Sequence, residues 1–191
     1  MNVLHQIVRQ ASRTPSAPAV IQLHARGDGG FDECVMFTYR SLVERARQQA
    51  ARLRKLAGPH APVGLVAGNS AEWVLADLAL MFGELIEVPV PLAFSAQQAA
   101  WLLHDCKIVL ADAAGTARIE QWRRTGLYPA VRTIDLTLHG PAGAPDHELP
   151  ALPPLPLLPP PGRDCIIKIV HTSGTTSQPK GVRIRRHGLD A

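Results

Sequence analysis

The chain has 191 residues, of which 46% are hydrophobic and 19% charged, an ordinary globular composition that excludes a wholly disordered protein. A formal net charge of +4 and an aromatic content of 5% give no indication of nucleic-acid binding. Cys34, Cys106 and Cys165 are far apart and form no C-x-x-C pair, so neither a disulfide framework nor a zinc ribbon is expected. With no continuous apolar run at the N-terminus and no stretch long enough to span a bilayer, we expect a cytoplasmic protein.

Hydrophobic periodicity alternates between helical and strand spacing along the first 136 residues. Capping-box spacing occurs at Ser41–Glu44 and at Ser95–Gln98, and either Thr38 or Ser41 could cap the second helix. Strands and helices that alternate with short links indicate right-handed βαβ units, so we predict an α/β fold with a mostly parallel sheet flanked by helices. The predicted helices cover 3–10, 40–57, 70–82, 95–104 and 115–125, and the predicted strands cover 18–23, 35–38, 62–67, 85–90, 107–111 and 131–135.

Residues 137–163 interrupt this alternation with a proline-rich segment. Proline lacks the amide donor and fixes φ, so this segment can form neither a helix nor a central strand. We interpret it as an extended connection over the surface. The alternative is a ligand for a proline-recognition domain, since Pro153 and Pro156 have P-x-x-P spacing.

The most informative segment follows a predicted strand at 164–170 and runs from His171 to Val182. Its hydroxyl groups, its glycines and one lysine would form a cradle for an anion at the end of a strand, and polyphosphate is a natural ligand. A Walker A loop is excluded, because proline precedes the lysine and glycine follows it. The alternative is a Ser/Thr-rich surface loop beside a basic strand. The candidate ligand-binding residues are Thr172, Ser173, Gly174, Thr175, Thr176 and Lys180.

Two other groups of residues could carry chemistry. His104, Asp105 and Cys106 could include a metal-binding pair, but neighbours this close in sequence do not converge on one helix face, so we interpret them as a helix end. His171, directly before the loop, could contact phosphate or substrate, or it could simply end the strand. We therefore predict no metal site and no catalytic residue within this chain.

The segment Thr172–Val182 resembles the phosphate loop of the adenylate-forming, or AMP-binding, superfamily. That group includes acyl-CoA and aryl-CoA synthetases, nonribosomal peptide adenylation domains and luciferases. Eleven residues fit the family pattern with one departure, Ser177, where the family usually has glycine. Weaker similarities occur in the expected order upstream, at Phe37–Leu42, Gly64–Trp73 and Leu85–Pro91, so the resemblance covers essentially the whole chain.

The resemblance implies a ligase of the acyl-CoA synthetase, AMP-dependent type that uses ATP and Mg²⁺ to convert a carboxylic acid into an acyl-adenylate. Coenzyme A or a carrier-protein phosphopantetheine would then accept the acyl group. It also implies that the hydroxyls and Lys180 hold the β- and γ-phosphates. Our preferred expectation is a stand-alone CoA ligase, for instance of fatty acid metabolism. The alternatives are an adenylation domain of a nonribosomal peptide synthetase and a non-catalytic anion-binding or interaction domain.

The later motifs of this superfamily, which supply the adenine pocket, the ribose contact and the catalytic lysine, find no counterpart before residue 191. The resemblance therefore implies the N-terminal part of an AMP-binding domain, truncated after the phosphate loop. We expect this chain alone to be inactive and to self-associate through exposed apolar surface. The expected organisation is a βαβ region at 1–136, the connection at 137–163, and a strand, loop and strand at 164–191.

Overall fold

The computed structural model describes residues 3–136, 165–172 and 180–185. The proline-rich segment 137–163 and its P-x-x-P alternative lie outside the described residues, as do loop residues 173–179. Within the described part, no helix combines the length and the apolar character needed to cross a membrane.

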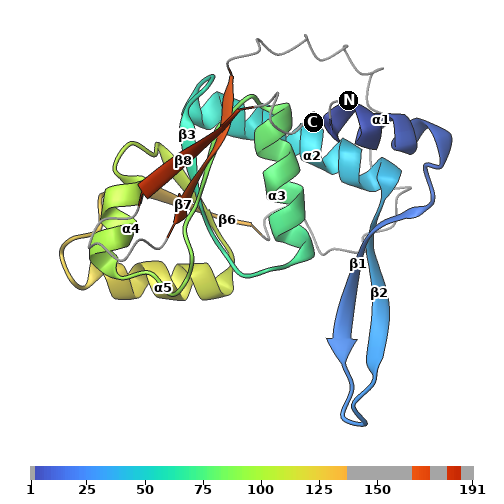
Figure 1. The fold of residues 1–191 in the computed structure, drawn as a ribbon, viewed down its shortest axis with the longest axis horizontal. Helices are drawn as coiled ribbons and strands as arrows, with labels where there is room; N and C mark the ends of the chain where they lie inside the picture. The colour runs from blue at the N-terminus through green and yellow to red at the C-terminus, as the bar shows by residue number, and fades with distance from the viewer. Residues whose placement is uncertain (1–2, 137–164, 173–179, 186–191) are drawn as a thin grey trace.

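A six-stranded sheet forms the centre of the molecule (Figure 1), with the strand order β6-β5-β3-β4-β7-β8. The first five of these strands run parallel to their neighbours, and β8 pairs antiparallel with β7. This arrangement confirms the predicted mostly parallel sheet. The strands are β3 (Pro62–Val66), β4 (Ile86–Pro89), β5 (Ile108–Ala111), β6 (Arg132–Asp135), β7 (Ile166–Thr172) and β8 (Lys180–Arg185).

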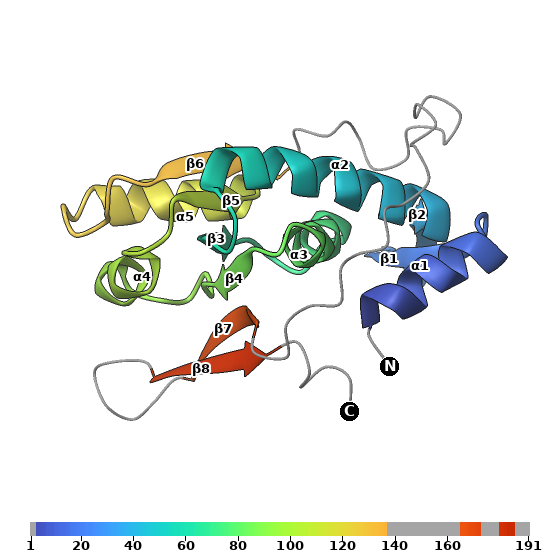
Figure 2. The same cartoon turned by 90° about the horizontal axis from the view of Figure 1, so that it is seen from above.

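Helices cover both faces of the sheet (Figure 2), as right-handed crossover connections require. α4 (Ala96–Leu103) and α5 (Ala113–Arg123) pack on one face, against a core that includes Val66, Val88 and Val109. α2 (Tyr39–Ala57) and α3 (Ala71–Phe82) pack on the other, against Leu65, Ile108 and Leu110. α1 (Val3–Arg13) joins a third apolar cluster with α2 and α3. Successive side chains of a strand point to opposite faces of the sheet, so the buried ones form one core on each face.

Four of the predicted helices begin at capping residues, and α3 begins after Ser70, whose side chain accepts a hydrogen bond from the Trp73 amide at 3.2 Å. Thr38 caps α2, and Ser41 is the third helical residue that completes the capping box, so the box predicted at Ser41–Glu44 was wrong by one turn. The box predicted at Ser95–Gln98 is confirmed for α4. Asp112, which the sequence reasoning missed, caps α5 and moves its start two residues ahead of the predicted position.

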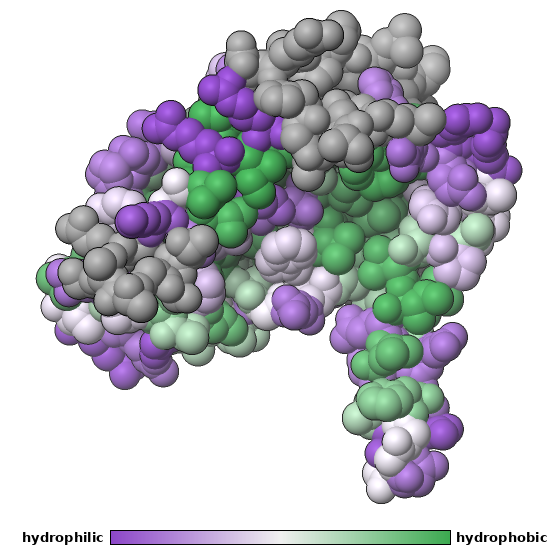
Figure 3. All heavy atoms as spheres, in the orientation of Figure 1, coloured by the Kyte–Doolittle hydropathy of each residue, from purple (hydrophilic) through white to green (hydrophobic). Residues whose placement is uncertain are grey.

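A separate two-stranded hairpin projects from the body of the molecule (Figure 1). It consists of β1 (Pro18–Ala25) and β2 (Phe31–Thr38), both longer than predicted, because regular pairing continues towards the glycine-containing turn. Apolar side chains lie along its length (Figure 3), and Ile21, Leu23, Phe31 and Val35 are each about half exposed or more. The βαβ pattern in the sequence did not predict a second sheet.

Candidate functional site

The carboxyl ends of β3, β4 and β7 meet at one edge of the sheet, around a cavity of about 310 Å³. The chain leaves β3 over the face that carries α3, whereas it leaves β4 over the opposite face that carries α4. In open α/β sheets, ligands bind outside the carboxyl ends of the strands at such a switch in connection. The residues lining this cavity are Leu65, Ala67, Asn69, Trp73, Pro89, Val90, Pro91, Val170 and His171.

The structure brings the first and last of the predicted ligand-binding residues together at the same edge. Thr172, at the end of β7, pairs directly with Lys180, at the start of β8. The Lys180 side chain is exposed. The predicted residues between them, Ser173, Gly174, Thr175 and Thr176, lie in the segment that the structure does not describe. The described part therefore places a cation at the base of the loop, next to the strand ends.

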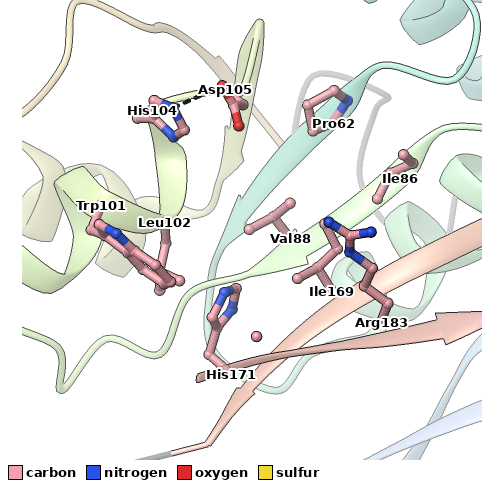
Figure 4. Close-up of a pocket in the computed structure, with 11 residues that line it drawn as sticks. Pro62, Ile86, Val88, Trp101, Leu102, His104, Asp105, Ile169, His171 and Arg183 are labelled. Atoms are coloured by element: carbon pink, nitrogen blue, oxygen red, sulfur yellow. Dashed lines mark ion pairs between the residues drawn. The ribbon is translucent and has the colours of Figure 1, made fainter. Parts of the chain in front are cut away.

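His171 separates this cavity from a second one of about 420 Å³ on the α4 face of the sheet (Figure 4). Its ring meets the Trp101 ring edge-on, with 5.7 Å between centroids. Gly181 leaves room for it, because a Cβ there would lie 3.1 Å from His171 Nε2. Among the described residues, the buried His171 Nδ1 has no hydrogen-bond partner, and burial lowers the pKa of the imidazole. His171 is therefore neutral near pH 7. One of its ring nitrogens can donate a hydrogen bond and the other can accept one.

The second cavity is lined mostly by apolar residues, with His104, Asp105 and Arg183 among its polar ones (Figure 4). Ile86 and Val88 from β4 and Ile169 from β7 form its floor, and Arg183 of β8 borders it. His104 and Asp105 form an exposed ion pair with 2.9 Å between Nε2 and Oδ1. Cys106 instead points into the core, where burial raises the pKa of its thiol to about 12. The three residues thus do not converge on one point, and His104 ends α4 as predicted.

Asp112 stabilises the same edge of the sheet from the carboxyl end of β5. One carboxylate oxygen accepts a hydrogen bond from the Gly115 amide at 2.6 Å, and the other accepts one from the Gly68 amide at 2.9 Å. A single side chain therefore joins the start of α5 to the loop after β3. Among the residues in the described ranges, no three His, Cys, Asp or Glu side chains come together as a metal site would require.

A partly buried ion cluster on the α3 face of the sheet connects β7 to the rest of the domain; the Lys168 and Asp77 side chains are each 19% exposed. Lys168 Nζ of β7 lies 2.8 Å from Glu87 Oε2 of β4 and 2.9 Å from Asp77 Oδ1 of α3. The same ammonium lies 5.2 Å from the centroid of the Trp73 ring, within cation–π range. Glu87 is only 1% exposed. The sequence reasoning missed this cluster, although a charged residue within each of two predicted central strands is a signal for a buried ion pair.

The cluster holds two carboxylates and one ammonium, so it carries a net negative charge when every group is ionised. Burial, reinforced by the neighbouring Asp77, raises the pKa of Glu87 to about 8 despite the opposing effect of Lys168. Burial alone would lower the pKa of Lys168, but Glu87 and Asp77 outweigh it and the pKa is raised. Near pH 7, Glu87 therefore retains a proton, and the cluster is close to neutral.

This protonation predicts a pH-dependent stability. The folded pKa of Glu87, about 8, exceeds its ordinary value of 4.5, so its contribution is fully present below the ordinary value and is lost as the pH rises through the folded value. We expect wild-type stability to fall relative to Glu87→Gln between pH 5 and 9, by more than about 1 kcal/mol. Urea unfolding of both proteins across this range measures the difference.

Glu120→Gln, which removes an exposed carboxylate on α5, provides the control and should follow the wild-type profile. Parallel stability profiles for wild type and Glu87→Gln would contradict the assignment of a retained proton to Glu87.

The profile of the AMP-binding enzyme family matches residues 7–189 of this chain. N-(5-amino-5-carboxypentanoyl)-L-cysteinyl-D-valine synthase of Penicillium rubens is 30% identical over 97% of this chain and 5% of its own length. Tyrocidine synthase 3 of Brevibacillus parabrevis is 30% identical over 80% of this chain and 2% of its own length. The crystal structure of the N-terminal domain of FACL13 from Mycobacterium tuberculosis has a TM-score of 0.66 at 21% identity, over 97% of this chain and 44% of that one.

The chain therefore belongs to the AMP-binding enzyme family, which confirms the resemblance inferred from the loop at Thr172–Val182. Its fold is similar to that of the N-terminal domain of FACL13. The chain spans about a twentieth or less of the length of the two curated relatives described above, and less than half of the structural neighbour.

Proposed function

We propose that this chain contributes the phosphate-binding part of an AMP-forming carboxylate ligase. The observation that carries the proposal is the pairing of Thr172 with Lys180, which presents a cation at the carboxyl ends of the central strands. Membership of the AMP-binding family supports ATP, bound with Mg²⁺, as the ligand. The reaction would release pyrophosphate and leave the acid as an acyl-adenylate.

In this proposal the loop acts by electrostatic stabilisation. Lys180 and the hydroxyls of Thr172, Ser173, Thr175 and Thr176 would hold the β- and γ-phosphates, and Gly174 would let the backbone approach them. Negative charge grows on pyrophosphate as it leaves, so donors fixed in advance stabilise the transition state more than the bound substrate. Mg²⁺ commonly binds through nucleotide phosphates with only one or two carboxylates, so the proposal needs no preformed cluster of protein ligands for the metal.

The names of the relatives are relevant to two parts of the proposal: which acid is activated, and which thiol accepts the acyl group. One relative described above is named as a synthase of a product that contains L-cysteinyl-D-valine, and the other as tyrocidine synthase 3. A further one from Salinispora arenicola is named as a probable non-canonical nonribosomal peptide synthetase. They favour an amino acid as the substrate and a carrier-bound phosphopantetheine as the acceptor. They give no support to our preferred expectation of a CoA ligase of fatty acid metabolism. The structural neighbour, at 21% identity, supports only the fold and not the choice of substrate.

The test is the binding of inorganic pyrophosphate, triphosphate and ATP by isothermal titration calorimetry. We expect weak binding of similar strength for triphosphate and ATP, since the contacts of the loop are to phosphate. Lys180→Ala should weaken each interaction about tenfold, the effect of losing one charge-assisted contact. Lys55→Ala removes an exposed lysine at the far end of α2 and should leave binding unchanged.

Unaltered affinity in Lys180→Ala would contradict the assignment of the loop. Absence of phosphate binding in the wild-type chain would favour the alternative of a domain that keeps the fold without the ligand site.

A further inference from the structure

We propose that the cluster of Lys168, Glu87 and Asp77 is a positioning device that fixes β7 in one register along β4, and so sets where Thr172 and Lys180, the two residues that flank the proposed phosphate loop, lie at the carboxyl edge of the sheet. The inference rests on the proposed function for the loop itself. It assigns a role in ligand binding to three residues that do not contact the ligand.

The backbone alone holds β7 weakly in register. The β4–β7 ladder has a single register pair, Glu87 opposite Lys168, whereas the β3–β4 ladder has four pairs. Pairing with β8 cannot compensate, because β8 has no further neighbour in the described part of the sheet. The β7–β8 ladder is also irregular between Ile166 and Lys168. Side chains must therefore specify how β7 lies along β4.

The cluster supplies that specification from two layers of the fold. Glu87 comes from the neighbouring strand and Asp77 from the helix above it, and both reach the same ammonium group within 3 Å. A slip of one residue would turn Lys168 to the opposite face and bring isoleucine, either Ile167 or Ile169, opposite Glu87. A slip of two residues would move the ammonium by about 7 Å, beyond the reach of both carboxylates. Either slip separates the Lys168 ammonium from both carboxyl groups and leaves the buried Glu87 without its partner, which favours the observed register.

The connection to the loop is short and stiff. Thr172 follows Lys168 by four residues in the same strand, a distance of about 13 Å at the usual rise. At that distance salt screens most of the direct interaction between exposed charges, so the cluster acts on the loop through position rather than through its field. On the other face, His171 packs on Trp101 and against Gly181, which limits rotation of the strand end.

The charged groups that face Glu87 are Lys168 from β7 and Asp77 from α3, while β3 places Val63 opposite it. The effect of the positive charge of Lys168 can therefore be tested separately from the effect of its side-chain shape. Lys168→Met keeps a long unbranched side chain without the charge, whereas Lys168→Arg keeps the charge. Asp77→Asn keeps the shape of Asp77 and removes its charge, and it remains informative if Lys168→Met folds poorly.

The experiment combines amide hydrogen exchange of peptides covering 166–172 with pyrophosphate titration, under conditions in which circular dichroism shows every protein folded. We expect Lys168→Met to accelerate exchange in β7 and to weaken pyrophosphate binding, each by about tenfold. Asp77→Asn should act in the same direction by a smaller factor, and Lys168→Arg, which keeps a cation beside Trp73, should remain within about twofold of wild type. Glu84→Gln, which breaks the Arg54–Glu84 ion pair away from β7, should change neither quantity.

Two results would overturn the positioning role. One is unchanged exchange in β7 for both Lys168→Met and Asp77→Asn. The other is a loss in Lys168→Arg as large as that in Lys168→Met. The positive charge at this position would then not be what holds β7. A wild-type chain that fails to bind pyrophosphate overturns the proposed phosphate site instead, and the exchange measurement then still decides whether the cluster holds β7.

Discussion

Replacement of Gly115 by alanine is expected to destabilise the protein by about 3 kcal/mol or more. A Cβ at this position would lie 1.7 Å from the carbonyl oxygen of Val66 and 2.7 Å from its carbonyl carbon. Both are backbone atoms of β3, so the clash is relieved only if α5 moves away from the sheet. Alanine favours helix over glycine by about 1 kcal/mol, which is too small to offset the clash.

Thermal unfolding followed by circular dichroism measures this effect. At 2–4 °C per kcal/mol for a domain of this size, the midpoint should fall by about 10 °C. Gly68→Ala is the matched control, because a Cβ there meets only Asp112 Oδ2 at an ordinary 3.6 Å and the amide that binds Asp112 is retained. An equal loss in both variants would show that close approach of α5 to β3 is not the cause.

Truncation of Trp122 to alanine is expected to cost about 3–5 kcal/mol. This side chain is 2% exposed, stacks on Tyr128 with 6.0 Å between ring centroids, and donates from Nε1 to the Phe94 carbonyl at 3.1 Å. Trp122→Phe separates the two contributions, because it retains most of the buried ring and loses the donor. The Phe94 carbonyl still accepts from Arg118 at 2.9 Å, so the phenylalanine variant should lose only about 1 kcal/mol.

Urea unfolding of the two variants, followed by circular dichroism, provides the comparison. If Trp122→Phe lost as much stability as Trp122→Ala, the hydrogen bond rather than the buried volume would dominate at this position.

Local signals in the sequence were sufficient to predict most elements of the fold. Apolar periodicity and the Ser95 cap depend on nearest neighbours along the chain, and they placed the helices and strands of the βαβ units within a few residues. The hairpin of β1 and β2 was not predicted as a separate sheet, because strand pairing partners are not encoded in periodicity.

The candidate site, like the fold, could be predicted only where its signal is local in the sequence. The loop motif predicted Thr172 and Lys180 as ligand-binding residues, and their pairing across β7 and β8 was not evident from the motif alone. Lys168 and Glu87 lie within two of the predicted strands, but their pairing could not be predicted, because it depends on β7 lying beside β4 rather than beside an element nearer in sequence. Long-range register is the information that one sequence does not contain.

The position of β7 in the strand order also has a consequence for how the domain assembles. Val63 and Glu87, paired between β3 and β4, are 24 positions apart, whereas Glu87 and Lys168 are 81 apart. Closing the longer loop costs about 1 kcal/mol more in chain entropy, and only one register pair is gained in return. The βαβ units from β3 to β6 can therefore form first from local contacts, with β7 and β8 docking on a finished surface. By the same reasoning, the strands that flank the loop are the part of the sheet that detaches most readily, while the rest of the domain stays folded.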